Sequence, residues 1–153
     1  MKGRKARMSL KSMQSGMSMI EVLVAVLVLA IGLLGVAALQ AGALRNSQSS
    51  YERSQVTILS HSLFDAMRVD RANAGTYNTG GWMCNPPAGA SLRDNQMSRW
   101  ITDMKRTLGD AANTCVQVQN CGTANPCQVT VRWDDTRGTG GVVNQSLSME
   151  TEL

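Results

Sequence analysis

The stretch Gly16-Met17-Ser18-Met19-Ile20-Glu21 opens an apolar run that extends from Val22 to Leu44. No charged residue lies between Glu21 and Arg45. About 20 apolar residues are enough for a helix to cross the hydrocarbon core of a membrane, so this run predicts a transmembrane helix. A carboxylate inside such a segment is costly. A plain membrane anchor does not need a carboxylate. Glu21 therefore indicates that the segment has a function in addition to anchoring.

The net positive charge of the chain comes from the residues that precede Met17. The whole chain of 153 residues has a formal net charge of +4. Residues 1–16 hold five of its 15 Lys and Arg and none of its 11 Asp and Glu, which leaves ten positive and eleven negative side chains elsewhere. A nucleic-acid-binding face has clustered basic residues, so no nucleic-acid partner is expected. The basic start predicts a cytoplasmic N-terminus and export of the C-terminal part.

One long helix is predicted from Ser18 to about Arg71, with Gly75 as its stop. Residues 17–44 form its transmembrane half and residues 45–75 its amphipathic half. Ser18 and Glu21 have the spacing of a capping box, which is an alternative explanation of the carboxylate. In the amphipathic half, apolar residues recur at helical spacing, and four polar residues fall outside that stripe. The stripe is Val56, Leu59, Leu63, Ala66 and Met67, and the residues outside it are Glu52, His61, Asp65 and Arg68.

Residues 76–153 predict a small α+β head. A loop rich in Gly, Asn and Pro covers residues 76–93, and a second helix is predicted from Asp94 to Leu108. After this helix the apolar residues recur at every second position, which predicts antiparallel strands. The expected strands are Cys115–Gln119, Cys127–Trp133 and one within Val142–Glu152.

All four cysteines lie after the apolar run, on the side where disulfides form and persist. Their spacing lacks the paired short gaps of a zinc site. A core this small needs covalent support, so two disulfides are expected. Of three possible connectivities we favour Cys121–Cys127, closing the hairpin loop, and Cys84–Cys115, tying the long loop to the sheet. The sequence leaves the choice open.

Motifs of catalysis are missing from the sequence. It contains no G-x-S-x-G, H-E-x-x-H, G-x-x-x-x-G-K or C-x-x-C pattern. The single histidine, His61, is predicted on the solvated face of the long helix, and Asp134-Asp135 is predicted to form a turn. We therefore expect no enzyme activity, no cofactor, no metal site and no small-molecule substrate.

The junction from Gly16 to Glu21 resembles the class III signal of type IV pilins and pseudopilins. The resemblance implies the type IV pilin fold, cleavage of the leader 1–16 after Gly16 by a prepilin peptidase, and N-methylation of Met17. Many pilins carry Phe where this chain has Met17, which remains unbranched and apolar. Glu21 would then pair with the new amine of a neighbouring subunit during assembly.

The run from Met17 to Gly35, and Val129-Thr130-Val131-Arg132-Trp133-Asp134, are similar to the PilV type of minor pilin. Major pilins often have a proline within the span, whereas the first proline here is Pro86. The resemblance implies an inner-membrane subunit with a periplasmic head that joins other minor pilins and the major pilin. It further implies a place at the fibre tip, where such subunits prime pilus assembly and support twitching motility and adhesion.

Two other interpretations fit parts of the sequence. Ala41-Gly42-Ala43 has the form of a secretory cleavage site, and cleavage after Ala43 would release a periplasmic protein that begins at Leu44. A minor pseudopilin of a type II secretion system would share the whole N-terminal arrangement, so the sequence leaves this alternative open.

Overall fold

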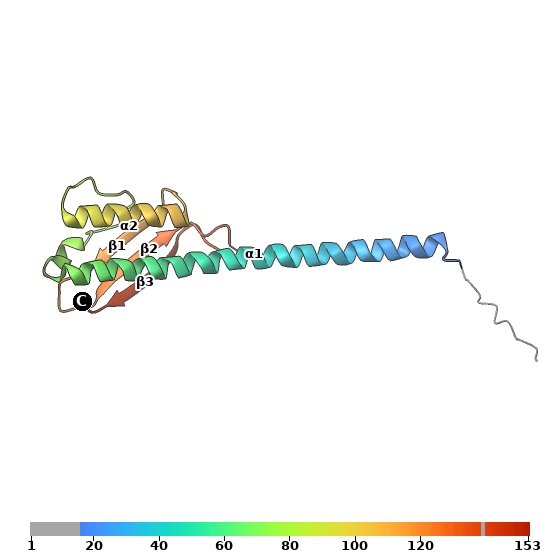
Figure 1. The fold of residues 1–153 in the computed structure, drawn as a ribbon, viewed down its shortest axis with the longest axis horizontal. Helices are drawn as coiled ribbons and strands as arrows, with labels where there is room; N and C mark the ends of the chain where they lie inside the picture. Colours follow the sequence, from blue (N-terminus) through green and yellow to red (C-terminus); the bar gives the residue numbers. More distant parts are fainter. Residues whose placement is uncertain (1–15, 139) are drawn as a thin grey trace, which may run out of the picture. The chain divides into compact units, whose positions relative to one another are not determined.

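The computed structural model describes residues 16–138 and 140–153, so the predicted leader lies almost wholly outside the described residues. The elements follow in the order α1 (Met19–Val69), a 3₁₀ helix η1 (Arg71–Tyr77), α2 (Leu92–Leu108), β1 (Cys115–Gln119), β2 (Cys127–Trp133) and β3 (Gln145–Thr151) (Figure 1). The chain divides into two units, Met1–Leu39 and Gln40–Leu153. Each unit is described by itself.

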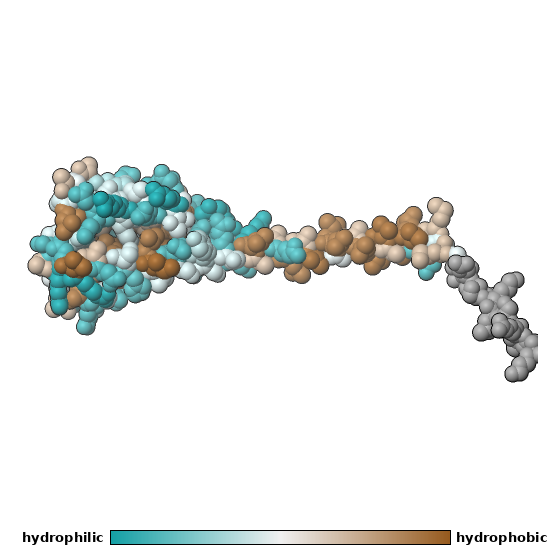
Figure 2. All heavy atoms as spheres, in the orientation of Figure 1, coloured by the Kyte–Doolittle hydropathy of each residue, from teal (hydrophilic) through white to brown (hydrophobic). Residues whose placement is uncertain are grey.

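In the first unit, the described residues from Met19 onward form the beginning of α1. Every described residue of this unit is exposed, including large apolar ones such as Leu23 and Leu34. Brown spheres dominate this part of the helix in Figure 2. By length and composition α1 is able to cross a membrane. An apolar surface of this kind requires lipid or other apolar side chains as its surroundings.

The second unit is built on an antiparallel sheet with strand order β1-β2-β3. Alternate residues of β2 are buried, as the period of two predicts. The sheet packs with α1 and α2 around one core, and the two predicted strand ranges Cys115–Gln119 and Cys127–Trp133 are confirmed. The core includes Val56, Leu63 and Met67 from α1, Met97, Ile101 and Met104 from α2, and Val116, Val118, Val129, Val131 and Trp133 from the sheet.

α2 begins two residues before the predicted start because Ser91 caps it. The Ser91 side chain accepts a hydrogen bond from the Asp94 amide at 3.0 Å, which satisfies one of the unpaired donors of the first turn. The Asp94 carboxylate in turn accepts from the Ser91 hydroxyl at 2.7 Å and from Arg93 at 2.7 Å. The predicted end at Leu108, followed by Gly109, is confirmed.

α1 ends at Val69, slightly before the predicted limit, and the chain continues into η1. The prediction that Gly75 stops the long helix is therefore wrong. Gly75 lies inside η1, where Ala74 and Tyr77 are buried against the head. Gly122, with a φ of +73°, approaches Gly75 so closely that a Cβ on Gly122 would lie 2.7 Å from the Gly75 nitrogen. This close approach explains the glycine at position 122, whereas a Cβ on Gly75 would only be in ordinary contact with the Cys121 carbonyl oxygen, at 3.5 Å.

Glu52 was predicted outside the buried stripe of α1, and this prediction is wrong. Its side chain is only 2% exposed. It accepts hydrogen bonds from Trp133 Nε1 at 3.1 Å and from Arg137 at 2.8 Å. The buried carboxylate is thus paired with a charge and with an indole donor, as burial of an ionised group requires. Because Glu52 lies four residues before the buried Val56, it continues the stripe by one helical turn.

The loop after β2 lies against the same turn of α1. Asp135 is 2% exposed and accepts a hydrogen bond from the Ser49 hydroxyl at 2.7 Å. A Cβ on Gly141 would meet the Asp135 carbonyl oxygen at 1.8 Å, so only glycine fits there. Asp134 accepts from the Thr136 amide, as the predicted turn implies, whereas Asp135 has a separate role in fixing the loop to the helix. We call Ser49, Glu52, Trp133, Asp135 and Arg137 the Glu52 cluster.

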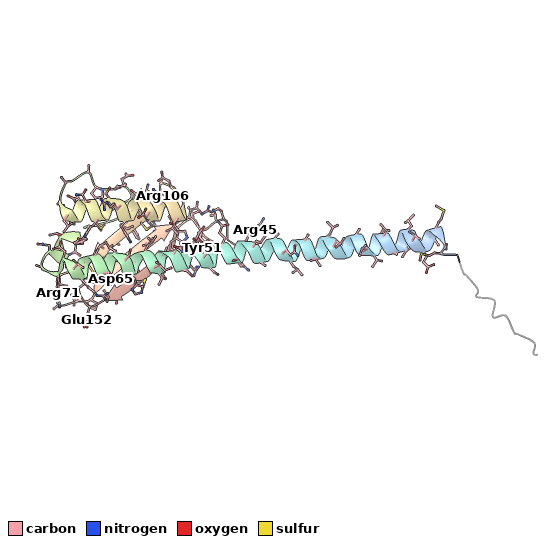
Figure 3. The ribbon with its side chains drawn as sticks, in the orientation of Figure 1. Arg45, Tyr51, Asp65, Arg71, Arg106 and Glu152 are labelled. Atoms are coloured by element: carbon pink, nitrogen blue, oxygen red, sulfur yellow. A yellow bond between two sulfur atoms is a disulfide. The ribbon has the colours of Figure 1, made fainter. Side chains whose placement is uncertain are left out.

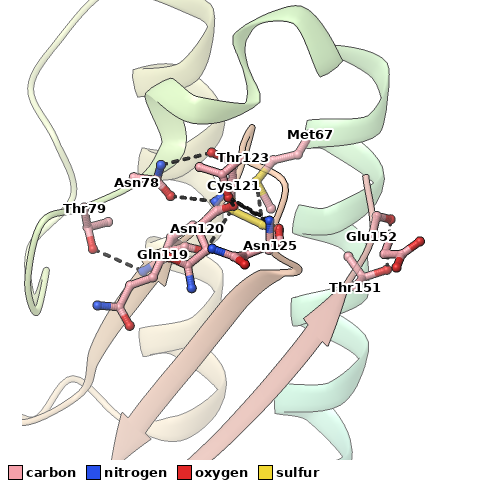
Figure 4. The surroundings of a disulfide bond; sticks show 12 residues. Met67, Asn78, Thr79, Gln119, Asn120, Cys121, Thr123, Asn125, Thr151 and Glu152 are labelled. Carbon is pink, nitrogen blue, oxygen red and sulfur yellow. Dashed lines mark hydrogen bonds between the residues drawn. A yellow bond between two sulfur atoms is a disulfide. The ribbon is translucent and has the colours of Figure 1, made fainter.

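Two disulfides join Cys84 to Cys115 and Cys121 to Cys127, the same pairs that the sequence analysis favours. The first attaches the loop before α2 to the start of β1. The second closes the loop between β1 and β2, and Figure 4 shows its surroundings. The Asn78 side chain pairs with both backbone polar groups of Cys121: it donates to the Cys121 carbonyl at 3.1 Å and accepts from the Cys121 amide at 3.0 Å.

Candidate assembly site

The predicted cleavage bond, between Gly16 and Met17, lies before the first turn of α1. Residues 16–18 have no regular secondary structure, and the helix begins at Met19. Gly16 is exposed, and Met17 is 74% exposed. A peptidase must reach the backbone of the bond that it cuts, and a bond outside the helix is free of helical hydrogen bonds. The local structure therefore leaves this bond open to cleavage.

Glu21 lies in the first turn of α1, and its backbone amide donates to the Ser18 carbonyl at 3.0 Å. The Val22 amide donates to the same carbonyl at 3.3 Å. In the part of the chain that the structure describes, no hydrogen bond joins the Ser18 hydroxyl to the Glu21 amide. The capping box, which was the alternative explanation of Glu21, is therefore not formed there.

The surroundings of Glu21 are apolar and exposed. Ile20 is 67% exposed, Val22 45% and Leu23 63%, and the apolar surface continues along the helix. Within residues 16–138 and 140–153 no salt bridge involves Glu21. When this helix surface is covered by lipid or by other helices, the carboxylate loses its water and requires a positively charged partner. The geometry thus places one acidic group, without an ion-pair partner among the described residues, in the first turn of an exposed apolar helix.

The other predicted site residues belong to the second unit. Cys84, Cys115, Cys121 and Cys127 are all engaged in the two disulfides and serve the stability of the head. His61 is exposed on α1, as predicted, and its ring meets the edge of Phe64 at a centroid distance of 6.3 Å. Among the described residues no group of three or more His, Cys, Asp or Glu side chains is placed to hold a metal ion.

Sequence reasoning missed the Glu52 cluster. The cluster depends on contacts between α1 and a loop that lies more than 80 residues further along the chain. A signal was present, because Glu52 and Val56 are separated by four residues and so share a helix face. From the sequence alone, a glutamate at that position is expected to be solvated, because its partners Trp133 and Arg137 are not visible within the helix.

Comparison with known families identifies a match over residues 11–37, described as the prokaryotic N-terminal methylation motif. The match spans the junction and the first part of α1. Comparison with curated proteins gives no match. No solved structure matches the chain either.

The fold is that of the type IV pilins: a long N-terminal apolar helix, a small antiparallel sheet of three strands and two disulfides in the C-terminal region. Together with the methylation motif, it supports a type IV pilin or pseudopilin. The motif implies processing by a prepilin peptidase and assembly with other pilins, and it indicates a structural protein rather than an enzyme. The apolar helix fits a membrane-anchored protein of this class.

Proposed function

We propose that this chain is a minor pilin of the type IV pilus, of the PilV type. In this proposal the leader 1–16 is removed after Gly16, and Met17 is methylated at its new amine. Residues 17–44 anchor the subunit in the inner membrane before assembly and pack among other subunits in the fibre. Residues 45–75 connect this half to the head, 76–153. The subunit then joins other minor pilins at the fibre tip, where it primes assembly and supports twitching motility and adhesion.

Glu21 performs the assembly step in this proposal. Cleavage creates a positive amine at Met17, and the carboxylate of a subunit already in place pairs with the amine of the incoming one. Two unit charges about 4 Å apart attract by about 4 kcal/mol at an effective dielectric constant of about 20. Desolvation offsets much of this attraction, so the pair fixes the alignment of neighbouring subunits more than it adds to the net stability of the fibre. A subunit placed one turn out of register would leave both charges unpaired in an apolar bundle.

The observation that carries the proposal is the position of Glu21 within the methylation motif. Its carboxylate stands at the start of a helix whose apolar residues are exposed from Ile20 onward. The cleavage bond lies just outside that helix. The absence of proline from the sequence before Pro86 and the PilV-like stretches support a minor rather than a major subunit.

The two other interpretations stand differently against the structure. Ala41, Gly42 and Ala43 lie inside α1, so a secretory cleavage after Ala43 would cut a continuous helix. The methylation motif also lies wholly before that site and would be lost with it. A minor pseudopilin of a type II secretion system fits the same motif and fold and therefore remains the alternative function.

Mass spectrometry of the protein isolated from membranes tests the proposal. We expect a mature chain that begins at Met17, carries one added methyl group on its amine and has two disulfides. A chain that begins at Leu44, or that retains residues 1–16, would contradict the pilin function. Deletion of the gene then separates the two fibre systems: lost piliation with normal protein secretion supports the minor pilin, and the reverse result assigns the chain to the pseudopilus.

A further inference from the structure

The two outer strands of the sheet differ in how their free edges are covered. On the outer side of β1, the Met83 amide donates to the Val116 carbonyl at 2.7 Å, and the Val116 amide donates to the Met83 carbonyl at 2.9 Å. The Thr79 amide likewise donates to the Val118 carbonyl at 3.0 Å. The segment that contains Thr79 and Met83 therefore occupies the free edge of β1 in the manner of a short added strand.

These contacts also fix which backbone groups of β3 face outward. Neighbouring residues of a strand direct their backbone groups to opposite sides, so Val116 faces away from β2 and Gln117 faces toward it. Gln117 pairs with Thr130, so the residues on either side of Thr130 bond to β3, where their partners are Leu147 and Met149. The alternate residues of β3 therefore direct their amide and carbonyl groups away from the sheet. These residues are Ser146, Ser148 and Glu150, whose outward backbone groups we call the β3 edge.

No strand of the described residues pairs with the β3 edge. β3 is the last strand in the order β1-β2-β3 and lies at the margin of the sheet (Figure 1). Ser146, Ser148 and Glu150 are all exposed. Within residues 16–138 and 140–153, the one hydrogen bond to these outward groups runs from the Gln145 side chain to the Ser146 carbonyl, at 3.3 Å. The three amides and the other two carbonyls are therefore open to a partner.

β3 also lacks most of the features by which proteins protect a free strand edge. Natural edge strands are short, carry proline or lysine, or are distorted by a bulge. β3 has seven residues, as many as β2, pairs with β2 without interruption, and holds neither proline nor lysine. Its one charged residue is Glu150, whose carboxylate accepts a hydrogen bond from Gln128 Nε2 at 2.7 Å. An edge of this length and regularity is a template for an added strand.

The side chains around the β3 edge define the strand that fits. Leu147 and Met149 pack against the core but remain half-buried, so an added strand meets apolar side chains on this face of the sheet. On the other face the two serines are small, and Glu150 carries a negative charge. Glu152, exposed just beyond β3 in Figure 3, adds a second carboxylate. The complementary strand therefore has apolar residues at alternate positions and a lysine or arginine beside Glu150.

A second copy of this chain does not fit as the occupant. The start of β3 lies near Glu52 of α1, because its first residue, Gln145, pairs with Trp133. Its last residue, Thr151, accepts a hydrogen bond from Arg68 of α1 at 2.8 Å, so β3 and this part of α1 run in the same direction. Two copies that join identical edges pair antiparallel, and their α1 helices would then run in opposite directions. Subunits of one fibre, as proposed above, enter it in a single orientation.

We infer that the β3 edge binds an extended segment of a different protein, which extends the sheet by one strand beyond β3. Backbone hydrogen bonds to Ser146, Ser148 and Glu150 supply the affinity of this contact. The apolar side chains of the segment and its basic residue beside Glu150 supply the specificity. The inference rests on the proposed function only where it excludes a second copy.

Hydrogen exchange of the full chain, resolved to single amides by mass spectrometry, tests whether the β3 edge is covered. The purified chain in detergent is compared with the chain in membranes and in sheared fibres. We expect the Ser148 and Glu150 amides to exchange at least about tenfold more slowly in one of these native samples than in detergent. The Leu147 and Met149 amides, which pair with β2, are the internal control and should exchange slowly in all samples. Fast exchange at Ser148 and Glu150 in every sample would overturn the inference.

A photoreactive phenylalanine derivative at Ser146 identifies the occupant. The same probe at the exposed Gln119, on the opposite outer strand, is the control. We expect an adduct from position 146, and not from position 119, with a segment of another protein that alternates apolar residues and contains a lysine or arginine. An adduct with a second copy of this chain, or no adduct, would overturn the inference.

Ser148→Pro, with Ser148→Ala as its matched control, tests whether the contact is a strand pairing. Proline removes the outward amide of Ser148, which β2 does not use, whereas alanine keeps it. We expect about tenfold less adduct from position 146 in the proline variant, the ratio that corresponds to one lost hydrogen bond. Equal adducts from the two variants would overturn the inference, and hydrogen exchange decides the question if the proline variant does not fold. If the mature chain begins at Met17 and enters fibres while the β3 edge exchanges freely, the proposed function stands and only this inference fails.

Discussion

Trp133 Nε1 donates a hydrogen bond to Glu52 Oε2 across 3.1 Å and so joins the end of β2 to the middle of α1. Glu52 is almost fully buried, and its other oxygen accepts from Arg137, whose side chain is about half exposed. The carboxylate thus has one buried neutral donor and one charged donor that reaches solvent. This arrangement satisfies the acid without burying two full charges, which would be more costly.

Replacing Glu52 tests this arrangement. Glu52→Gln keeps the size of the side chain but removes the charge that faces Arg137 and Trp133. We expect the free energy of unfolding to fall by about 2 kcal/mol, the scale of a hydrogen bond to a charged group. Denaturant unfolding of the full chain in detergent measures this. Glu150→Gln is the control, because Glu150 is exposed and its loss should change stability by less than about 0.5 kcal/mol.

The two disulfides should contribute unequally to the free energy of unfolding. They join residues 31 and 6 positions apart, and a longer closed loop restricts the unfolded chain more strongly. Loop-closure entropy predicts losses of about 4 kcal/mol for Cys84→Ser with Cys115→Ser and about 2 kcal/mol for Cys121→Ser with Cys127→Ser. Denaturant midpoints of the two double variants, compared with wild type, provide the measurement. The reverse order would show that native contacts of the short loop outweigh the entropy term.

Gly122 should tolerate alanine far less well than Gly80. Both have positive φ, so both substitutions carry the strain of about 1 kcal/mol that a side chain meets in this region. At Gly122 the new Cβ also collides with the Gly75 backbone, whereas at Gly80 it meets open space. Overpacking of this kind lowers the free energy of unfolding by a further amount of about 1–3 kcal/mol. Thermal unfolding of the two variants should separate them by several degrees, and equal melting temperatures would contradict the close approach.

Asp94 should contribute to the acid stability of the head. The Ser91 hydroxyl, and then Arg93, hold the pKa of the Asp94 carboxyl below its usual range. A carboxyl whose pKa is lower in the folded than in the unfolded state stabilises the fold above its unfolded pKa. That contribution is lost as the pH falls through the folded pKa. Melting temperatures of wild type and Asp94→Asn should therefore converge as the pH falls from about 5 to about 2. A constant difference across this range would argue against the pKa shift.

Glu21→Ala should leave membrane insertion intact and impair entry into fibres. The substitution makes the helix more apolar, which favours insertion, but it removes the partner proposed for the Met17 amine of a neighbour. Immunoblots of membranes and of sheared fibres measure the two steps separately. Glu21→Asp, which keeps the charge on a shorter side chain, should restore part of the incorporation. Normal incorporation of Glu21→Ala would disprove the charge pairing.

Local patterns were sufficient for most elements of the fold. The alternation around Val129 and Val131 predicted β2 with its observed bounds, and the apolar positions from Met97 to Leu108 predicted most of α2. The methylation motif includes the junction from Gly16 to Glu21, on which the prediction for Glu21 rests. These signals lie within single segments of sequence, where periodicity and motif spacing are directly visible.

Apart from the two favoured disulfide pairs, features that join distant segments could not be predicted in the same way. The burial of Glu52 depends on Trp133 and Arg137, and the buried position of Asp135 depends on Ser49. The end of α1 was misplaced because η1 is fixed by its contact with the loop around Gly122. Each of these errors concerns a residue whose environment is supplied by another element.

The Glu52 cluster also constrains the order in which the head can be built. Glu52 leaves the ribosome early, whereas its partners Trp133 and Arg137 follow it by 81 and 85 residues. Until those residues have been translated, the carboxylate has neither its indole nor its guanidinium donor. A nascent chain stopped before Trp133 would hold a finished helix beside an open core, so the head should reach its native form only when synthesis of the chain is nearly complete.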